Sequence, residues 1–308
     1  MRWEKKGLIY VPDGEVDWSK THAQIPTPLQ LNEKILRIYF GTRDAYCRTQ
    51  ISHVDLDIKN PLNIIERAKK PDIAIGFPGL HDDCGAMPFC VFKDKHQFKF
   101  YYTGWHIPTT VSYDLSIALA TSDDLLNFNK YSKGPLISKN IYEAYWAAAP
   151  YVMYDGKYKM WYISCYDWVR VNNTLEPVYN IKYAESIDSI NWNLTHNVAI
   201  KPKSNNEALG RPWVIKENGL YKMWYSYRGS KNYRNRNGEH YKIGYAESTN
   251  GIDWTRKDAS IGLDVSESGW DSEMIEYASI FQFKDTKYMF YNGNGFGKSG
   301  FGLAVSKD

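Results

Sequence analysis

The segment AAAPYVMYDGKYKMWYISCYD, residues 147–167, decides the fold. An apolar stretch around Pro150 is joined through Asp155-Gly156 to an aromatic stretch, and LGRPWVIKENGLYKMWYSYRG at residues 209–229 repeats this pattern closely. Aromatic and β-branched residues favour strands, and an Asp-Gly or Asn-Gly pair between two such stretches is typical of a tight hairpin. Each segment therefore predicts two antiparallel strands.

The same pattern occurs three more times, at residues 23–44, 84–106 and 274–294. Regular spacing of a supersecondary unit indicates a repeat architecture. The repeats begin 60, 62, 62 and 66 residues apart when they are anchored on Pro28, Pro88, Pro150, Pro212 and the equivalent Ala278.

Each hairpin is followed by a third predicted strand, and in three repeats by a fourth, which begins near an aromatic residue. The third strands are ISHVDLD, LSIALATSDD, IKYAESIDS, IGYAESTNG and FGLAVSKD, and the fourth are NFNKYSKGPLI, NWNLTHNVAI and DWTRKDASIGL. Four antiparallel strands repeated radially are typical of a β-propeller. The sequence thus predicts an all-β, five-bladed β-propeller with four-stranded blades.

The fifth repeat reaches Asp308 directly after its third strand, and RWEKKGLIYV at residues 2–11 resembles the fourth strands of the other repeats. We expect this N-terminal strand to complete the last blade and close the ring, which removes an exposed sheet edge. Two domains would not need this arrangement, so we expect residues 1–308 to form a single domain.

Composition narrows the class of function. The formal net charge is +3 and no Lys/Arg run is present, so nucleic-acid binding is not expected. The four cysteines lack CxxC spacing, and no segment has the length or the apolar core of a membrane span or signal peptide. We expect a cytoplasmic protein without membrane contact. The aromatic content of 16% is high, and flat aromatic faces could stack on sugar rings.

The motifs YKMWY, YAESxDxxxW and YMFYNGNGFG resemble the five-bladed propeller glycosidases of families 32, 43, 68 and 130 across the whole chain. The resemblance implies that a glycosidic bond is cleaved, transferred or phosphorolysed in a funnel at the propeller axis by carboxylates on the innermost strands. Invertase-like and arabinanase-like members carry an aspartate on the first strand of blade 1. Here that strand carries His22 and Gln24 and no acid.

Cleavage of a glycoside typically needs two carboxyl groups that flank the bond. The innermost strands begin shortly before the anchor residues, and acids occur there in blade 2 (Asp82, Asp83) and blade 5 (Glu273, Glu276). Strand alternation puts Asp82, Gln24, Trp146 and Glu276 on one parity and Asp83, Arg211 and Glu273 on the other. Blades 2 and 5 both flank blade 1, so we predict Asp82 with Glu273 or Glu276 as the catalytic pair. The competing interpretation is that these acids cap turns or pair with arginines.

Arginines and polar residues at the predicted rim form a second group of candidates. Arg43 and Arg211 could bind a sugar carboxylate or a phosphate through two parallel hydrogen bonds, although Asp44 offers Arg43 a salt bridge instead. Alanines leave space around Trp146, which we expect to face the channel and contact ligand. The predicted substrate-binding residues are His22, Gln24, Arg43, Asp44, Trp105, His106, Trp146, Asp167, Arg211 and Asn292.

Three functions remain in competition. The leading one is a glycoside hydrolase with paired carboxylates. The second is a glycoside phosphorylase, for which one acid and basic phosphate ligands suffice, and the third is a non-catalytic sugar-binding propeller. The chain contains no P-loop, dinucleotide fingerprint or HExxH motif, so we expect no cofactor and no metal ion. The predicted partner is a carbohydrate or sugar-derived small molecule, with phosphate as a further candidate.

Overall fold

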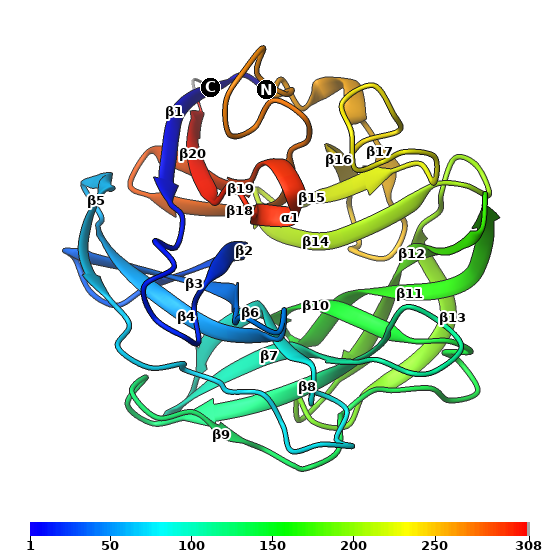
Figure 1. Cartoon of the computed structure of the whole chain (residues 1–308). Coiled ribbons are helices and arrows are strands. Elements are labelled where there is room, and N and C mark those ends of the chain that lie inside the picture. The colour runs from blue at the N-terminus through cyan, green and yellow to red at the C-terminus, as the bar shows by residue number, and fades with distance from the viewer. Residues whose placement is uncertain (307–308) are drawn as a thin grey trace.

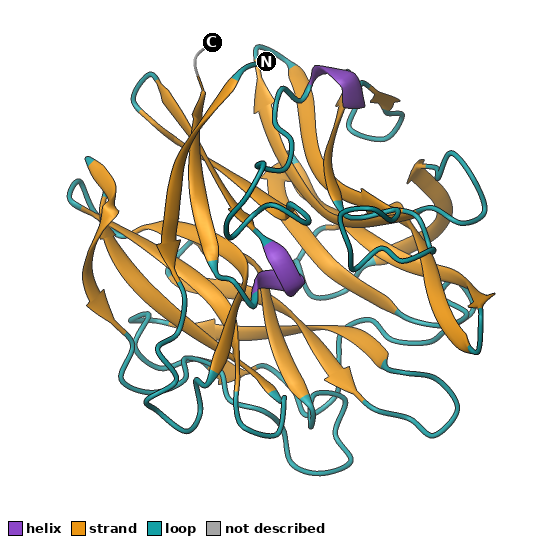
Figure 2. Ribbon diagram, turned by 45° about the horizontal axis from the view of Figure 1, so that its top comes forward, coloured by secondary structure: helices purple, strands orange, loops and turns teal. Residues whose placement is uncertain are grey.

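The computed structural model describes residues 1–306, and its regular secondary structure is almost entirely β-strand. Figure 2 shows strands throughout the described chain and two short helical turns, the 3₁₀ turn η1 (Asp258–Ser260) and α1 (Asn294–Gly297). No helix in residues 1–306 has the length and apolar character needed to cross a membrane.

The strands follow the predicted repeats. The first two repeats share an eight-stranded sheet, whose halves meet at one parallel pair between Thr49 and Gly85. The first half contains β2 (Thr21–Gln30), β3 (Ile35–Arg43), β4 (Thr49–Asp57) and β5 (Asn60–Arg67). The second half contains β6 (Gly85–Asp94), β7 (Gln97–His106), β8 (Asp114–Ser122) and β9 (Asn129–Lys130).

Each later repeat forms a four-stranded antiparallel sheet of its own. The third contains β10 (Ala147–Asp155), β11 (Lys157–Val171), β12 (Thr174–Ser186) and β13 (Asn193–Ile200). The fourth contains β14 (Ala208–Glu217), β15 (Leu220–Arg228), β16 (Lys242–Ser248) and β17 (Thr255–Arg256). The last contains β18 (Glu276–Phe283), β19 (Thr286–Asn292), β20 (Phe301–Ser306) and β1 (Trp3–Tyr10).

The two ends of the chain meet in this last sheet. Strand β1 pairs antiparallel with β20, with Trp3 opposite Ser306 and Tyr10 opposite Phe301, and both strands lie side by side in Figure 1. Lys5 on β1 also forms a 2.7 Å ion pair with the buried Asp271. The N-terminal segment therefore supplies the fourth strand that the last repeat lacks.

The first strands of the repeats contact one another in cyclic order: β2 contacts β6, β6 contacts β10, β10 contacts β14, β14 contacts β18, and β18 contacts β2. Figure 1 shows the labels of these strands grouped near the middle of the molecule. Side chains on the first strands thus face a shared central region, as a site at the axis requires.

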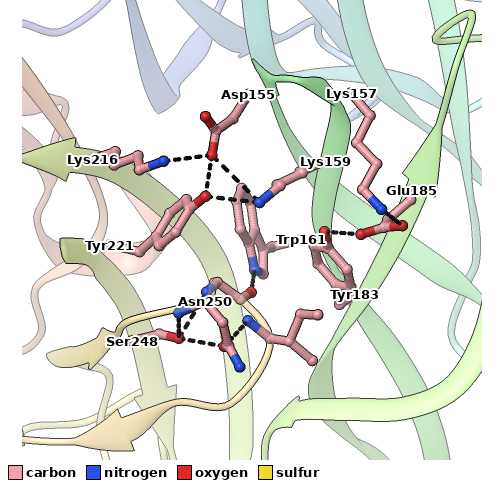
Figure 3. A network of polar contacts seen from close by, with 12 residues as sticks. Asp155, Lys157, Lys159, Trp161, Tyr183, Glu185, Lys216, Tyr221, Ser248 and Asn250 are labelled. Atoms are coloured by element: carbon pink, nitrogen blue, oxygen red, sulfur yellow. Dashed lines mark hydrogen bonds and ion pairs between the residues drawn. The ribbon is translucent and has the colours of Figure 1, made fainter. Parts of the chain in front are cut away.

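Interlocking side chains join neighbouring sheets away from this centre (Figure 3). Lys159 on β11 donates a 2.7 Å hydrogen bond to the hydroxyl of Tyr221 on β15, and the indole of Trp161 donates to the carbonyl of Gly251. Gly251 belongs to a turn in which the Ser248 hydroxyl accepts a hydrogen bond from its backbone amide. The recurring AES motif and the YKMWY tryptophan are therefore explained by turn formation and packing.

The structure corrects the register of the first repeat. Four first strands contain a bulge residue with positive φ: Ile25 (60°), Ala149 (52°), Arg211 (33°) and Tyr277 (55°). Each is followed by the anchor position, which in the first repeat is Pro26, so the first spacing becomes 62 residues as in the next two repeats. Two prolines two residues apart made Pro28 an equally good anchor in the sequence, and the shift by two leaves the predicted strand parity unchanged.

Candidate functional site

A cavity of about 380 Å³ opens among the first strands. Aromatic rings and arginines dominate its wall, and no Asp or Glu within residues 1–306 lines it. The aromatic, basic and amide side chains of the wall include Gln24, Arg43, Trp105, Tyr113, Trp146, Tyr179, Arg211, Arg228, Tyr233, Arg234, Tyr241, Tyr277 and Phe296.

The strand bulges position this wall. Ile25, Ala149, Arg211 and Tyr277 all line the cavity and all have positive φ. A positive φ is a strained backbone conformation for residues other than glycine, above all for a β-branched residue such as isoleucine. Bulges re-aim side chains and are common beside active sites. The local strain therefore coincides with the place where a ligand would bind.

Arg43 and Arg211 carry positive charge into the wall, and no carboxylate within residues 1–306 forms an ion pair with either of them. The Nε atom of Arg43 donates to the side-chain oxygen of Gln24 at 3.3 Å, and its guanidinium lies over the Trp105 ring at 5.7 Å. Arg211 donates to the backbone carbonyls of Pro26 and Tyr277. Burial lowers the pKa of Arg43 and lowers that of Arg211 to about 9, because neither cation has a nearby anion to offset its desolvation.

Arg228 is held differently, among tyrosine rings. Its guanidinium lies 3.8 Å from the centre of the Tyr233 ring and donates to the Tyr241 hydroxyl at 3.2 Å. The Tyr241 and Tyr179 hydroxyls are 2.5 Å apart. A guanidinium on an aromatic face keeps its charge while its orientation is fixed, so Arg228 adds a rigid positive group to the cavity.

Glu276 does not line the cavity itself, but it directly precedes the lining residue Tyr277. It begins β18 at the position before the bulge, and its equivalents Gln24, Ala148 and Gly210 all line the cavity. Its side chain is fully buried, and neither carboxyl oxygen has a hydrogen-bond partner among the described residues. Burial raises the pKa of Glu276 well above its ordinary value, and Arg228 opposes this shift. A carboxyl group in this state can hold a proton at neutral pH, as a general acid requires.

Asp82 does not line the cavity. Its Oδ2 lies 2.6 Å from the Lys130 ammonium and accepts from the Tyr102 hydroxyl at 3.0 Å, while Oδ1 has no partner. Glu143 and Asp271 are bound in the same way, each by a lysine and by a tyrosine 19 or 20 residues later in the chain. Recurrence of this acid–tyrosine–lysine contact in three sheets favours a structural role for Asp82, and its catalytic role stays a prediction.

The other predicted residues divide between the cavity and other positions. Gln24, Arg43, Trp105, Trp146 and Arg211 line it. Six others do not line it. Glu273 and Asp167 are exposed. Asp44 forms an ion pair with Arg48, His106 contacts Asp83, and His22 forms a hydrogen bond with Thr21. Asn292 on β19 forms hydrogen bonds with the backbone of Ala23 and Ile25. The salt bridge that Asp44 seemed to offer Arg43 is thus made with Arg48.

His22 nevertheless affects the electrostatics beside the cavity. Its pKa is lowered to about 3 by burial, by Arg43 and by Lys298, in that order. The imidazole is therefore neutral at physiological pH. A basic neighbourhood that suppresses histidine protonation also favours the binding of an anion.

Several lining residues were missed by the sequence analysis. Tyr233 and Arg234 lie in the connection between β15 and β16, and Phe296 lies in α1. Strand periodicity carries no information on where such loops fold back. A cluster of aromatic and basic residues, KNYRNR at 231–236, was the available signal.

Trp146 offers a direct optical test of the cavity. Its ring packs against Tyr113 and Tyr179, and its indole nitrogen has no hydrogen-bond partner. We predict that a bound sugar changes its fluorescence, measured as the difference between the parent protein and Trp146→Phe. Saturable quenching that is identical in both proteins would show that Trp146 does not report on the ligand.

Relatives and solved structures place the chain among known proteins. No protein-family model matches it. It is 35% identical over 307 residues to the "Uncharacterized protein Rv1502" of Mycobacterium tuberculosis, and the match covers 99% of both chains. A solved "Glycoside hydrolase" superposes with a TM-score of 0.75 at 16% identity, covering 98% of this chain and 90% of the other.

A second solved structure is described as "The GH130 family of mannoside phosphorylases contains glycoside hydrolases that target beta-1,2 mannosidic linkages in Candida mannan". It superposes with a TM-score of 0.72 at 16% identity and covers 98% of this chain and 93% of the other. The fold is therefore that of the propeller glycosidases, and the chain belongs to the family of the Mycobacterium tuberculosis protein Rv1502.

Proposed function

We propose that this protein is a glycan-processing enzyme that cleaves a glycosidic bond with inorganic phosphate as the nucleophile. The observation that carries the proposal is that the buried Arg211 and the half-buried Arg43 both line the cavity without a carboxylate partner within residues 1–306. A phosphate between them would offset their desolvation through charge-assisted hydrogen bonds. Hydrolysis by paired carboxylates, the leading expectation from sequence, has less support because Glu276 lacks a second acid beside it. Asp82 is held by Lys130 and Glu273 is exposed, and neither lines the cavity.

The chemical step would need one acid. A phosphate oxygen attacks the anomeric carbon, the bond from that carbon to the bridging oxygen breaks, and the leaving oxygen takes a proton. We assign this proton to Glu276, whose raised pKa keeps it available. The products are a sugar 1-phosphate and a shortened glycan, so atoms and charge balance without a cofactor.

The architecture that frames this chemistry is also part of the proposal. We infer that residues 1–308 form one domain in which five four-stranded blades make a closed ring. The cyclic contacts of the first strands and the pairing of β1 with β20 support this arrangement. A closed ring would hold the arginines of the first and fourth repeats at fixed positions across one central cavity.

Phosphate binding tests the proposal before any substrate is known. We expect isothermal titration to detect inorganic phosphate binding that is weakened at least about tenfold by Arg43→Gln, because a buried charge-assisted contact contributes roughly 1.5–3 kcal/mol. Arg48→Gln is the matched control, since Arg48 pairs with Asp44 and does not line the cavity. Equal phosphate affinity in the parent protein and Arg43→Gln would contradict the assignment.

A further inference from the structure

The connection between β15 and β16 reaches over the cavity and is tied to a different sheet. At the base of this connection, the backbone amide of Gly229 donates to the carbonyl of Glu239 at 3.1 Å. The backbone amide of Glu239 donates to the carbonyl of Lys231 at 3.0 Å. Tyr233 and Arg234, between these contacts, both line the cavity. Backbone hydrogen bonds therefore close the base of this segment, and its tip carries the two cavity-lining side chains.

One buried carboxylate on β12 holds this tip. Oε2 of Glu176 accepts from the Tyr233 hydroxyl at 2.7 Å, and Oε1 accepts from Nη1 of Arg234 at 3.1 Å. Glu176 is 9% exposed, whereas Arg234 is exposed. Both oxygens of a single side chain are thus used to connect the fourth sheet with the third.

The same contacts build a layered cationic wall. The Tyr233 ring centre lies 3.8 Å from the Arg228 guanidinium and 4.3 Å from that of Arg234. A guanidinium offers five N–H donors, so the single hydrogen bond to Glu176 leaves donors of Arg234 for a ligand. The Tyr233 ring contacts both cations. Arg228 already donates to the Tyr241 hydroxyl and to the carbonyls of Gly229 and Pro177, so Arg234 is the cation of this pair that keeps donors for a ligand.

We propose that Glu176 is a positioning residue for anion recognition and that Arg234 is a specificity-determining residue that contacts the anion. Glu176 acts through Tyr233 and Arg234 by holding residues 230–239 as a wall of the cavity. This inference rests on the proposed anion-binding function. It adds that a loop, and not only the propeller strands, selects negatively charged ligands.

The variant Glu176→Gln separates positioning from simple electrostatics. Its amide oxygen can still accept from Tyr233, but its NH₂ group cannot accept from Arg234. Loss of a negative charge beside the cavity would by itself strengthen phosphate binding. Loss of positioning would weaken phosphate binding, because side chains that Glu176 no longer holds in place must then be immobilised on binding. This costs about 0.5–1.5 kcal/mol for each side chain. The sign of the change therefore identifies the role.

The experiment measures phosphate affinity by calorimetry and the rate of trypsin cleavage after Lys231, Arg234 and Arg236. We expect Glu176→Gln to bind phosphate about five- to tenfold more weakly and to be cut faster within the segment. Saturating phosphate should slow the cleavage of the parent protein. Glu33→Gln is the control, because it removes one exposed carboxylate outside the cavity wall and should change neither quantity.

Unchanged or tighter phosphate binding by Glu176→Gln would overturn the positioning role, whatever the cleavage rate. Arg234→Gln with unchanged phosphate affinity would overturn the assignment of Arg234 as an anion contact. If the parent protein binds no phosphate at all, the proposed function fails and this inference fails with it. The two failures are distinguishable because the first two outcomes require a parent protein that binds.

Discussion

Replacing Glu276 with glutamine should lower turnover by about 10²–10⁴-fold, the usual contribution of a general acid, while the fold is retained. The change is nearly isosteric, and the carboxyl group makes no hydrogen bond that the amide would break. We expect an unchanged melting temperature at pH 5 and ligand binding within a few-fold of the parent protein. Near-normal turnover of the true substrate by Glu276→Gln would exclude Glu276 as the proton donor.

The pH dependence of stability provides an independent check on Glu276. Since burial raises its pKa, the folded protein holds this proton more tightly than the unfolded chain. The resulting stabilisation is fully present below the ordinary glutamate pKa of 4.5 and is lost as pH rises toward the raised value. Glu276→Gln should remove this decline. Identical stability profiles from pH 4 to 8, an interval of about four units chosen to span the shift, would show that Glu276 is not perturbed.

Asp82→Asn tests the competing assignment of the acid. Because Asp82 is buried against the ammonium of Lys130, its neutralisation leaves that cation without its partner. Removing one member of a fully buried ion pair typically costs about 3–5 kcal/mol, and the cost here should be smaller because the Lys130 side chain is 26% exposed. A lower melting temperature with a normal turnover number per folded molecule would support a structural role. A stable variant with greatly reduced turnover would restore Asp82 as a catalytic residue.

Deleting residues 1–11 should lower the free energy of unfolding of the whole protein substantially. The deletion removes the buried side chains of Trp3, Ile9 and Tyr10, exposes the edge of β20 and leaves Asp271 without Lys5. At roughly 1.5–3 kcal/mol for each buried side chain, the loss is about 5 kcal/mol or more. The melting temperature, followed by circular dichroism, should fall by roughly 10 °C or more.

A circular permutant is the control for this deletion. Trp3 lies opposite Ser306, so β1 can follow β20 as a simple hairpin if residues 2–11 are moved behind Asp308 with a short Gly-Ser linker. This chain should regain most of the lost stability, because the strand is restored in its native register. Cooperative melting of the truncated protein within a few degrees of the full chain would contradict ring closure by β1.

The sequence predicted the strands better than the site, and the reason is physical. Strands are specified by local alternation and turn residues, which is why the hairpin at Asp155-Gly156 and the pairing of residues 2–11 with the last repeat could be found. Strand parity placed Gln24 and Glu276 together, and both occupy the position before a bulge. The same parity included Asp82, although Asp82 precedes its strand and belongs to a structural contact.

Strand alternation and turn residues do not predict where a loop folds back or which partner a charged side chain takes. Tyr233 and Arg234 reach the cavity because Glu176, 58 residues before Arg234, holds them there, and no local pattern encodes that contact. The choice of Arg48 over Arg43 as the partner of Asp44 depends on the turn that Asp44 caps through the amides of Tyr46 and Arg48. This choice leaves Arg43 without an acid, which is the basis of the proposed function.

The decisive measurement is phosphate release from a panel of sugar 1-phosphates, mannose 1-phosphate included, each offered with and without a panel of acceptor sugars. We expect that one donor releases inorganic phosphate only when an acceptor is present and that the reverse cleavage of the product requires phosphate. Glu276→Gln should slow both reactions by about 10²–10⁴-fold, and Arg43→Gln should raise the phosphate concentration that cleavage needs by at least about tenfold. A sugar that binds in the cavity and is never turned over under either condition would identify a binding protein. Release of free sugar from a glycoside at a rate independent of phosphate would contradict phosphorolysis and identify a hydrolase instead.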